Sequence, residues 1–179
     1  MNTAVGVKAR TAGALYFLSV LTAAFGELVV RGRLNVAVGL VAVSGMIAVT
    51  LLLYFIFKPV NATLCRCAAA LNLVGLGFEA LRFNPLGVDA AIVMLGFYCL
   101  LMGYLIFRST FMPPVLAAPM AIAGLAWLTF VSPPLAEHLS PYNLACGILG
   151  EAAVCLWLLL MGVNVQRWTQ QAGAARQHP

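Results

Sequence analysis

The sequence carries very little charge. Of its 179 residues, only 8% are Asp, Glu, Lys or Arg, whereas 63% are hydrophobic and the mean hydropathy is +1.00. A soluble domain carries roughly a quarter charged residues. The composition therefore excludes a soluble globular protein. It also leaves no room for a separate soluble domain, because polar residues gather only at the two ends.

Residues that support several kinds of membrane chemistry are scarce. Both histidines, His138 and His178, lie outside the apolar runs, which excludes a haem or a histidine-based metal site within the membrane. Lys8 and Lys58 are the only lysines and neither lies within a run, so a retinal Schiff base is excluded. There is no glycine-rich phosphate loop and no serine nucleophile motif. No cofactor and no metal are predicted.

What the chain does have is long apolar runs. A helix needs about 20 apolar residues to cross a bilayer of about 30 Å. Six such runs cover residues 11–30, 34–57, 62–81, 86–107, 115–131 and 143–165, and each break between them carries charge, amide or proline residues. The sequence predicts an all-α, single-domain, six-transmembrane-helix bundle. The first run is longer than a signal-peptide core, so it is expected to be retained.

Lysine and arginine predict the orientation of the bundle. The net charge of +5 comes from residues in short loops, so it sets topology and predicts no nucleic-acid partner. Three basic residues lie on one side of the runs, namely Arg31, Arg33 and Arg82. Seven lie on the other side, which places both termini in the cytoplasm of a bacterial inner membrane: Lys8, Arg10, Lys58, Arg66, Arg108, Arg167 and Arg176.

A faint internal repeat joins the two halves. LYFIFK at residues 53–58 is similar to GYLIFR at residues 103–108. Ahead of each, an odd-numbered run ends in a glutamate with an arginine just beyond it, Glu27 with Arg31 and Glu79 with Arg82. This pattern indicates a repeated helical hairpin, an arrangement found in transporters and also in membrane enzymes and scaffolds.

All five acidic residues fall in the predicted extracytoplasmic half, and Glu27, Glu79 and Glu151 lie within helices. A carboxylate at the centre of a transmembrane helix costs about 2.5 to 3.5 kcal/mol, so such a residue is a functional candidate. Glu27 can pair with Arg31 at i+4. Asn72 lies on the same helix face as Glu79, with a glycine between them, which indicates an inward-facing polar stripe.

Glu151 differs from the other two because no basic residue lies within a turn of it. Its negative charge must be balanced by a basic residue of another helix, Arg31, Arg33 or Arg82, or else the carboxyl is protonated. Gly147 and Cys155, one turn away on either side, are small and leave room on that face. The other cysteines are also expected to be buried packing residues, since the chain has no CxxC pair.

Two polar residues have simpler explanations at helix N-termini. Asn61 precedes the third run and is expected to cap it. Asp89 lies in the first turn of the fourth run, where a negative charge favours the helix dipole.

Four segments of the chain resemble a bacterial multi-span membrane family known only as a domain of unknown function. They are RTAGALY at residues 10–16 and the segments at 53–61, 101–109 and 151–164. The resemblance implies a small inner-membrane protein and no particular activity. In size, helix count and use of carboxylic acids, the chain is also similar in kind to small integral-membrane terpene cyclases, although no motif aligns with them.

These observations lead to a functional hypothesis. The sequence predicts a membrane enzyme in which carboxyl groups act as acid and base on a lipophilic, isoprenoid-like substrate, by protonation and cyclisation. The catalytic candidates are Glu79, Glu151 and Glu27. The substrate-binding candidates are Asn72, Arg31, Arg82, Tyr98 and Trp127, of which the two aromatic residues could stabilise a carbocation.

Two alternatives stay open. The same glutamates could serve a small-solute or proton-coupled carrier, or they could form structural ion pairs in a membrane subunit. The predicted partners are the lipid bilayer and a lipophilic small molecule, and the sequence leaves the oligomeric state open.

Overall fold

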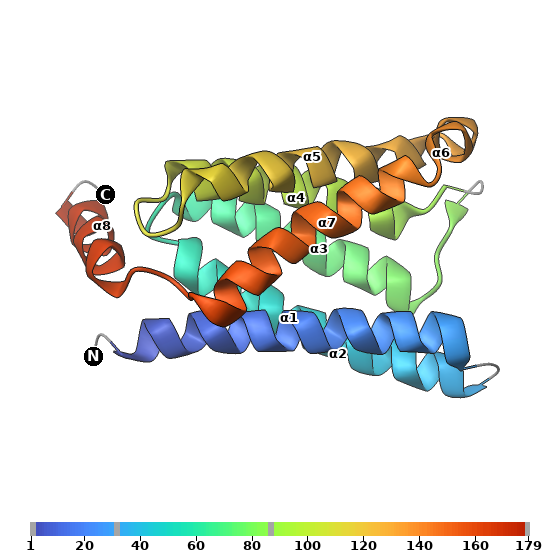
Figure 1. The fold of residues 1–179 in the computed structure, drawn as a ribbon, viewed down its shortest axis with the longest axis horizontal. Coiled ribbons are helices and arrows are strands. Elements are labelled where there is room, and N and C mark those ends of the chain that lie inside the picture. The colour runs from blue at the N-terminus through green and yellow to red at the C-terminus, as the bar shows by residue number, and fades with distance from the viewer. Residues whose placement is uncertain (1–2, 31–32, 86–87, 178–179) are drawn as a thin grey trace.

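A computed structural model describes residues 3–30, 33–85 and 88–177, with the side chains of Thr3, Glu27, Leu28, Arg33 and Gln177 excepted. Within these residues the chain is all helical (Figure 1). Six long helices form the body of the molecule: α1 (Thr3–Val29), α2 (Arg33–Phe57), α3 (Ala62–Ala80), α4 (Ala90–Arg108), α5 (Ala117–Leu128) and α7 (Tyr142–Leu160). The 3₁₀ turns η2 (Pro114–Leu116) and η3 (Thr129–Val131) extend α5 at its two ends into one stretch, Pro114–Val131, and the remaining helices are α6 (Pro133–Leu139) and α8 (Val165–Gln177).

Five helical stretches are long and apolar enough to cross a membrane, where the sequence predicts six. These are Ala4–Gly26, Leu34–Phe57, Ala90–Arg108, Pro114–Val131 and Tyr142–Leu160. Among the helices described, α3 has the length of a span but is less apolar, because Arg66, Asn72 and Glu79 interrupt it. The all-helical class is confirmed, and five of the predicted spans are supported as candidates.

Short polar side chains fix where two of these helices begin. Asn61 precedes α3, and its side chain accepts a hydrogen bond from the backbone N–H of Leu64 at 2.9 Å. Asp89 precedes α4 and accepts from the N–H of Ile92 at 3.2 Å. Each oxygen satisfies an N–H group that has no partner within its helix. Both residues were predicted to act at helix N-termini, and both do.

The six long helices pack in a closed ring. Each helix contacts the next in chain order, and α7 contacts both α5 and α1, which closes the ring. Figure 1 shows α7 crossing in front of the others, from the end that carries α6 to α1 at the opposite end. Both termini lie at the same end of the bundle, beside α8 (Figure 1).

Glycines allow the closest of these approaches. A Cβ atom at Gly13 would lie 2.4 Å from the backbone nitrogen of Leu159, and one at Gly150 would lie 2.2 Å from the carbonyl oxygen of Pro119. The first glycine joins α1 to α7, and the second joins α5 to α7. Small residues of this kind let helix backbones meet in a membrane, where hydrophobic driving force between helices is absent.

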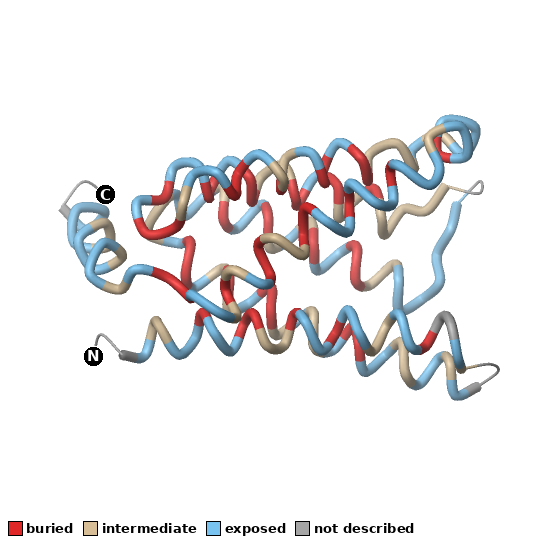
Figure 2. The backbone as a smooth tube through the Cα atoms, in the orientation of Figure 1, coloured by how far each residue is buried: buried red, intermediate tan, exposed pale blue. Residues whose placement is uncertain are grey.

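The surface of the ring is strongly apolar. Many large hydrophobic side chains face outward, among them Leu18 at 58% exposure, Val41 at 63% and Leu149 at 69%. Figure 2 shows exposed positions recurring along the lengths of the long helices and not only in the loops. Soluble monomers rarely show such extended apolar surface. Together with the five candidate spans, this surface indicates an integral membrane protein.

The C-terminal segment forms a further helix. The last apolar run continues to residue 165 in the sequence, whereas α7 ends at Leu160. Gly162 turns the chain with φ +70°, a conformation typical of the residue that follows a helix. Helix α8 then packs against the end of the ring, where the Trp168 indole N–H donates to the carbonyl of Ile56 at 2.8 Å.

Candidate functional site

The buried carboxyl of Glu151 is the centre of the site. It projects from α7 and accepts hydrogen bonds from two other helices: the Tyr16 hydroxyl of α1 donates to Oε2, and the Trp127 indole Nε1 of α5 donates to Oε1 at 2.6 Å. The Cys99 thiol of α4 lies near the carboxyl as well. Hydrogen bonds at the carboxyl thus join three helices of the ring, namely α1, α5 and α7.

These partners differ from the arginines expected from the sequence. Arg82, one of the three candidates, lies on the turn after α3 and donates from Nη2 to Oδ1 of Asn35 at 2.5 Å. Arg31 lies outside the described residues, as does the side chain of Arg33. The partners of Glu151 therefore come from other helices, as expected, but they are neutral aromatic side chains that donate hydrogen bonds.

Small residues on α7 place these donors. A Cβ atom at Gly147 would lie 2.4 Å from the Trp127 ring, so the glycine provides the space that the indole occupies. One turn beyond Glu151, the buried Cys155 thiol contacts the carbonyl of Gly13 at 3.6 Å. Both small residues leave space beside Glu151: α5 occupies the space at Gly147, and α1 occupies the space at Cys155.

A cavity of about 330 Å³ reaches Glu151, and we call it the Glu151 cavity. Its volume lies within the range of small-molecule sites. Residues from α1, α2, α4 and α7 surround the carboxyl with mainly apolar groups, including Phe17, Val20, Leu95, Ile148 and Leu156. Tyr16, Trp127 and Glu79 also line it. A carboxyl group in such apolar surroundings is well placed to meet a lipophilic molecule.

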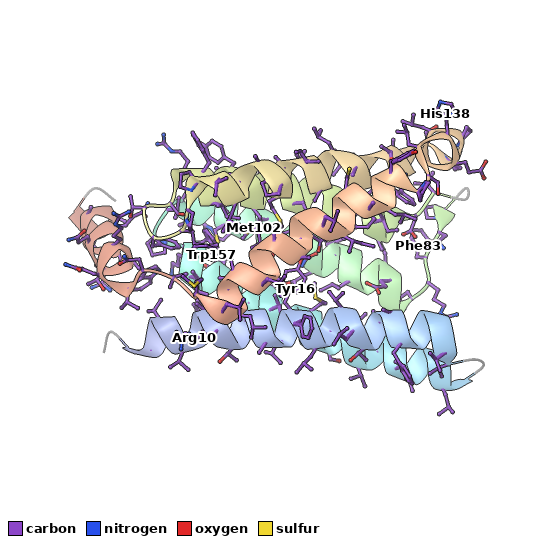
Figure 3. All side chains as sticks on the ribbon, in the orientation of Figure 1. Arg10, Tyr16, Phe83, Met102, His138 and Trp157 are labelled. Carbon is purple, nitrogen blue, oxygen red and sulfur yellow. The ribbon has the colours of Figure 1, made fainter. Side chains whose placement is uncertain are left out.

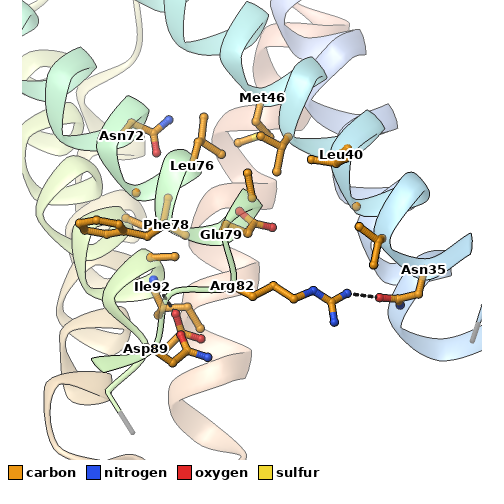
Figure 4. Close-up of a pocket in the computed structure, with 18 residues that line it drawn as sticks. Asn35, Leu40, Met46, Asn72, Leu76, Phe78, Glu79, Arg82, Asp89 and Ile92 are labelled. Atoms are coloured by element: carbon orange, nitrogen blue, oxygen red, sulfur yellow. Dashed lines mark hydrogen bonds between the residues drawn. The ribbon is translucent and has the colours of Figure 1, made fainter. Parts of the chain in front are cut away.

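A second cavity, of about 580 Å³, lies between α2, α3 and the start of α4, and we call it the Asn72 cavity (Figure 4). Its lining is more polar and includes Asn72, Asn35, Glu79, Arg82, Asn84 and Asp89. Figure 4 places Asn72 at one end of the cavity and the Arg82–Asn35 hydrogen bond at the other.

The two cavities adjoin. Val43, Met46, Glu79 and Leu95 line both of them. Three of these residues are apolar, and Met46 has an unbranched, adaptable side chain. Glu79 thus lines the apolar cavity that contains Glu151 as well as the polar one.

The structure distributes the predicted site residues as follows. Glu79, Glu151 and Trp127 line the Glu151 cavity, while Asn72 and Arg82 line the Asn72 cavity. Tyr98 is buried at 3% exposure and is not part of either lining. Glu27 lies on α1, with its side chain outside the described part of the structure, and Arg31 is outside it altogether.

Sequence reasoning missed two residues of the site. Tyr16 lies in the middle of α1 at 1% exposure, and Figure 3 labels it. The sequence feature that could have identified it is a tyrosine hydroxyl within an apolar run, because a buried tyrosine usually finds a hydrogen-bond partner. Asn35 on α2 was also missed; its amide nitrogen donates to the carbonyl of Gly26 at 2.8 Å while its oxygen accepts from Arg82.

Proton chemistry at Glu151 follows from its two donors. An indole N–H only donates, so Oε1 is an acceptor whether the carboxyl is charged or neutral. A tyrosine hydroxyl donates or accepts, so Oε2 is the oxygen on which a proton can reside.

Among the described residues, no three His, Cys, Asp or Glu side chains come together in a group that could hold a metal ion.

Comparison with known proteins gives one match. No curated protein and no solved structure matches the chain, so the likeness in kind to terpene cyclases gains no support. The resemblance to a family without an assigned function is confirmed for part of the chain, from the last turn of α3 to just beyond α7. That part, residues 76–162, matches the family described as a domain of unknown function, DUF4386.

Proposed function

We propose that the protein is a membrane-embedded enzyme in which the Glu151 carboxyl exchanges a proton with a lipophilic substrate. The observation that carries this proposal is the position of the carboxyl, buried at the wall of an apolar cavity and held by Tyr16 and Trp127. Charged groups within a membrane are costly and are generally retained for function.

The proton moves at Oε2. In the acid form, Oε2 carries the proton and Trp127 donates to Oε1. When the proton passes to an alkene or epoxide of the substrate, the carboxylate remains, and the Tyr16 hydroxyl stabilises it by donating to Oε2. The aromatic walls formed by Phe17 and Trp127 would stabilise a cation left on the substrate. Glu79, which lines the same cavity, would take up a proton at the end of the reaction.

An isoprenoid is the substrate class that this chemistry fits. Its hydrocarbon skeleton suits an apolar cavity, and its double bonds accept a proton to form a carbocation. Cyclisation then needs only an acid, a base and exclusion of water.

The proposed enzyme crosses the membrane six times, with both termini in the cytoplasm of a bacterial inner membrane. The position of both termini at one end of the ring supports an even number of crossings, with α3 as the sixth (Figure 1). A cysteine introduced at Glu137 in α6 should react with an impermeant maleimide added to intact cells, whereas one at Gly173 in α8 should not. The opposite labelling pattern would reverse the orientation.

The catalytic proposal is tested with isosteric variants. Glu151→Gln and Glu79→Gln, made singly, should each lower conversion of prenylated substrates by membranes by at least about 100-fold, the range of general acid–base catalysis. Glu137→Gln, the same change on the exposed surface of α6, should leave conversion unchanged. Full activity in both site variants would overturn the proposal.

A carrier is the second candidate, and the adjoining cavities favour it. Glu79 lines both, so one carboxyl could meet a solute or proton in either cavity. A carrier predicts solute uptake into proteoliposomes that responds to a pH gradient, whereas the enzyme predicts a new product without net transport. A purely structural subunit, the remaining alternative, predicts neither result.

A further inference from the structure

We infer that the Asn72 cavity binds the hydroxyl-bearing head of a neutral amphiphile whose hydrocarbon chain extends into the Glu151 cavity. This deepens the proposed function, on which it rests, by naming the class of substrate: a lipid alcohol rather than a lipid phosphate or amine.

Two hydrogen bonds fix the orientation of the Asn72 amide. Asn72 is 3% exposed, and its Nδ2 donates to Oγ1 of Thr50 at 2.7 Å. The Thr50 hydroxyl itself donates to the carbonyl of Met46 at 2.8 Å, so toward Asn72 it can only accept. This chain of hydrogen bonds fixes which end of the amide is nitrogen and which is oxygen.

This orientation leaves the amide oxygen of Asn72 as an acceptor. Over the ranges that the structure describes, no donor reaches Oδ1 of Asn72, although the residue is buried and lines the cavity. Because no fully buried side-chain nitrogen or oxygen among the described residues lacks a partner, this oxygen is open to the cavity. A hydroxyl hydrogen entering the cavity would satisfy this oxygen.

The lining of the Asn72 cavity contains acidic and basic side chains. Glu79 and Asp89 bring carboxylates, and Arg82 brings a guanidinium, to the same cavity. A phosphate head would meet the two carboxylates, and an ammonium head would meet the guanidinium. A neutral hydroxyl avoids both conflicts.

Shared apolar residues give the hydrocarbon chain of the lipid a path between the two cavities. Val43, Met46 and Leu95 line both cavities, so an apolar tail leaving the Asn72 cavity meets apolar side chains on its way to Glu151. Trp127 lines the Glu151 cavity but not the Asn72 cavity. A bound lipid alcohol would therefore have its head near Asn72 and its chain near Trp127.

Tryptophan quenching tests both ends of this placement at once. The full chain carrying Trp157→Phe and Trp168→Phe keeps Trp127 as its only tryptophan. In phosphatidylcholine nanodiscs it is titrated with an ω-bromoalkanol, its methyl ether, and the corresponding alkyl phosphate and alkylamine. Bromine quenches the indole only if the tail reaches it.

We expect the alcohol to quench Trp127 and to bind about tenfold more tightly than its methyl ether, which corresponds to one net hydrogen bond. Asn72→Leu should abolish this preference, whereas Asn143→Leu, a matched change of another buried asparagine outside both cavities, should retain it. Equal binding of alcohol and ether by the unmutated cavity, or tighter binding of the phosphate or the amine, overturns the inference without any need for the Leu variants to fold.

The experiments distinguish failure of the acid–base role of Glu151 from failure of the head-group site at Asn72. This assay measures binding alone, so loss of the alcohol preference leaves the acid–base role of Glu151 standing. An active Glu151→Gln variant that still prefers the alcohol would remove the acid–base role and leave the head-group site.

Discussion

The indole ring of Trp127 occupies the space in which a Cβ atom at Gly147 would lie, 2.4 Å from two of its ring carbons. This contact between α5 and α7 sets the position from which the indole N–H reaches Glu151 at 2.6 Å. The absence of a side chain at Gly147 thus allows the hydrogen bond between Trp127 and the buried carboxyl.

Gly147→Ala should therefore destabilise the protein. The added methyl group forces the indole away, at a cost of about 1–3 kcal/mol for overpacking. The free energy of unfolding in detergent, measured with a chemical denaturant, would show the loss. Gly77→Ala is the matched control, because a Cβ atom there meets nothing within 4 Å. It should be neutral or stabilising by up to about 1 kcal/mol, and equal effects of the two changes would contradict the packing described.

Glu151→Gln and Glu151→Leu should separate protonation from packing. Glutamine can accept from Trp127 through its oxygen and donate to Tyr16 through its nitrogen, so the melting temperature should change little. Leucine leaves the indole N–H and the hydroxyl without partners, at about 1–3 kcal/mol each. Thermal unfolding of the three proteins in one detergent compares them. A leucine variant as stable as the glutamine variant would show that the hydrogen bonds contribute nothing.

Arg82 should respond differently to alanine and to glycine. Its backbone has φ +50°, a left-handed conformation that costs a non-glycine residue about 1 kcal/mol. Both substitutions remove the hydrogen bond to Asn35, but only glycine relieves the backbone. Arg82→Gly should thus be more stable than Arg82→Ala by about 1 kcal/mol in denaturant unfolding. Should alanine prove the more stable, the turn after α3 differs from the one described.

Trp168→Phe should loosen α8. The substitution removes the hydrogen bond to the Ile56 carbonyl while keeping most of the apolar surface. Local opening then becomes easier, so trypsin should cleave after Arg167 several-fold faster. The control is Trp157→Phe on α7, for which no change at Arg167 is expected. Unchanged cleavage in both variants would mean that this hydrogen bond does not hold the helix.

The sequence predicted the helices well where apolar runs are bounded by breakers. The predicted run 34–57 corresponds to α2 at Arg33–Phe57, and the run 62–81 to α3 at Ala62–Ala80. Helix α8 was missed because it is mainly polar, so it lacks the apolar signal that marks a span. Its apolar contacts come from the end of the ring, which a single sequence does not reveal.

The candidate site was predictable only in part. The isolation of Glu151 from basic neighbours pointed to a partner on another helix. The identity of that partner depends on the contact between α1 and α7, which brings together residues 135 positions apart. Hydropathy shows that helices exist but carries no information about which of them are adjacent, so Tyr16 could not be assigned.

Closure of the ring by α1 and α7 also has a consequence for biosynthesis. Helices insert in the order of synthesis, so α1 enters the bilayer long before α7 is made. Until then, the Tyr16 hydroxyl and the Trp127 indole lie in the membrane without the Glu151 carboxyl to which both later donate hydrogen bonds. The nascent chain therefore has an open seam between α1 and α5, and insertion of α7 both closes that seam and creates the site.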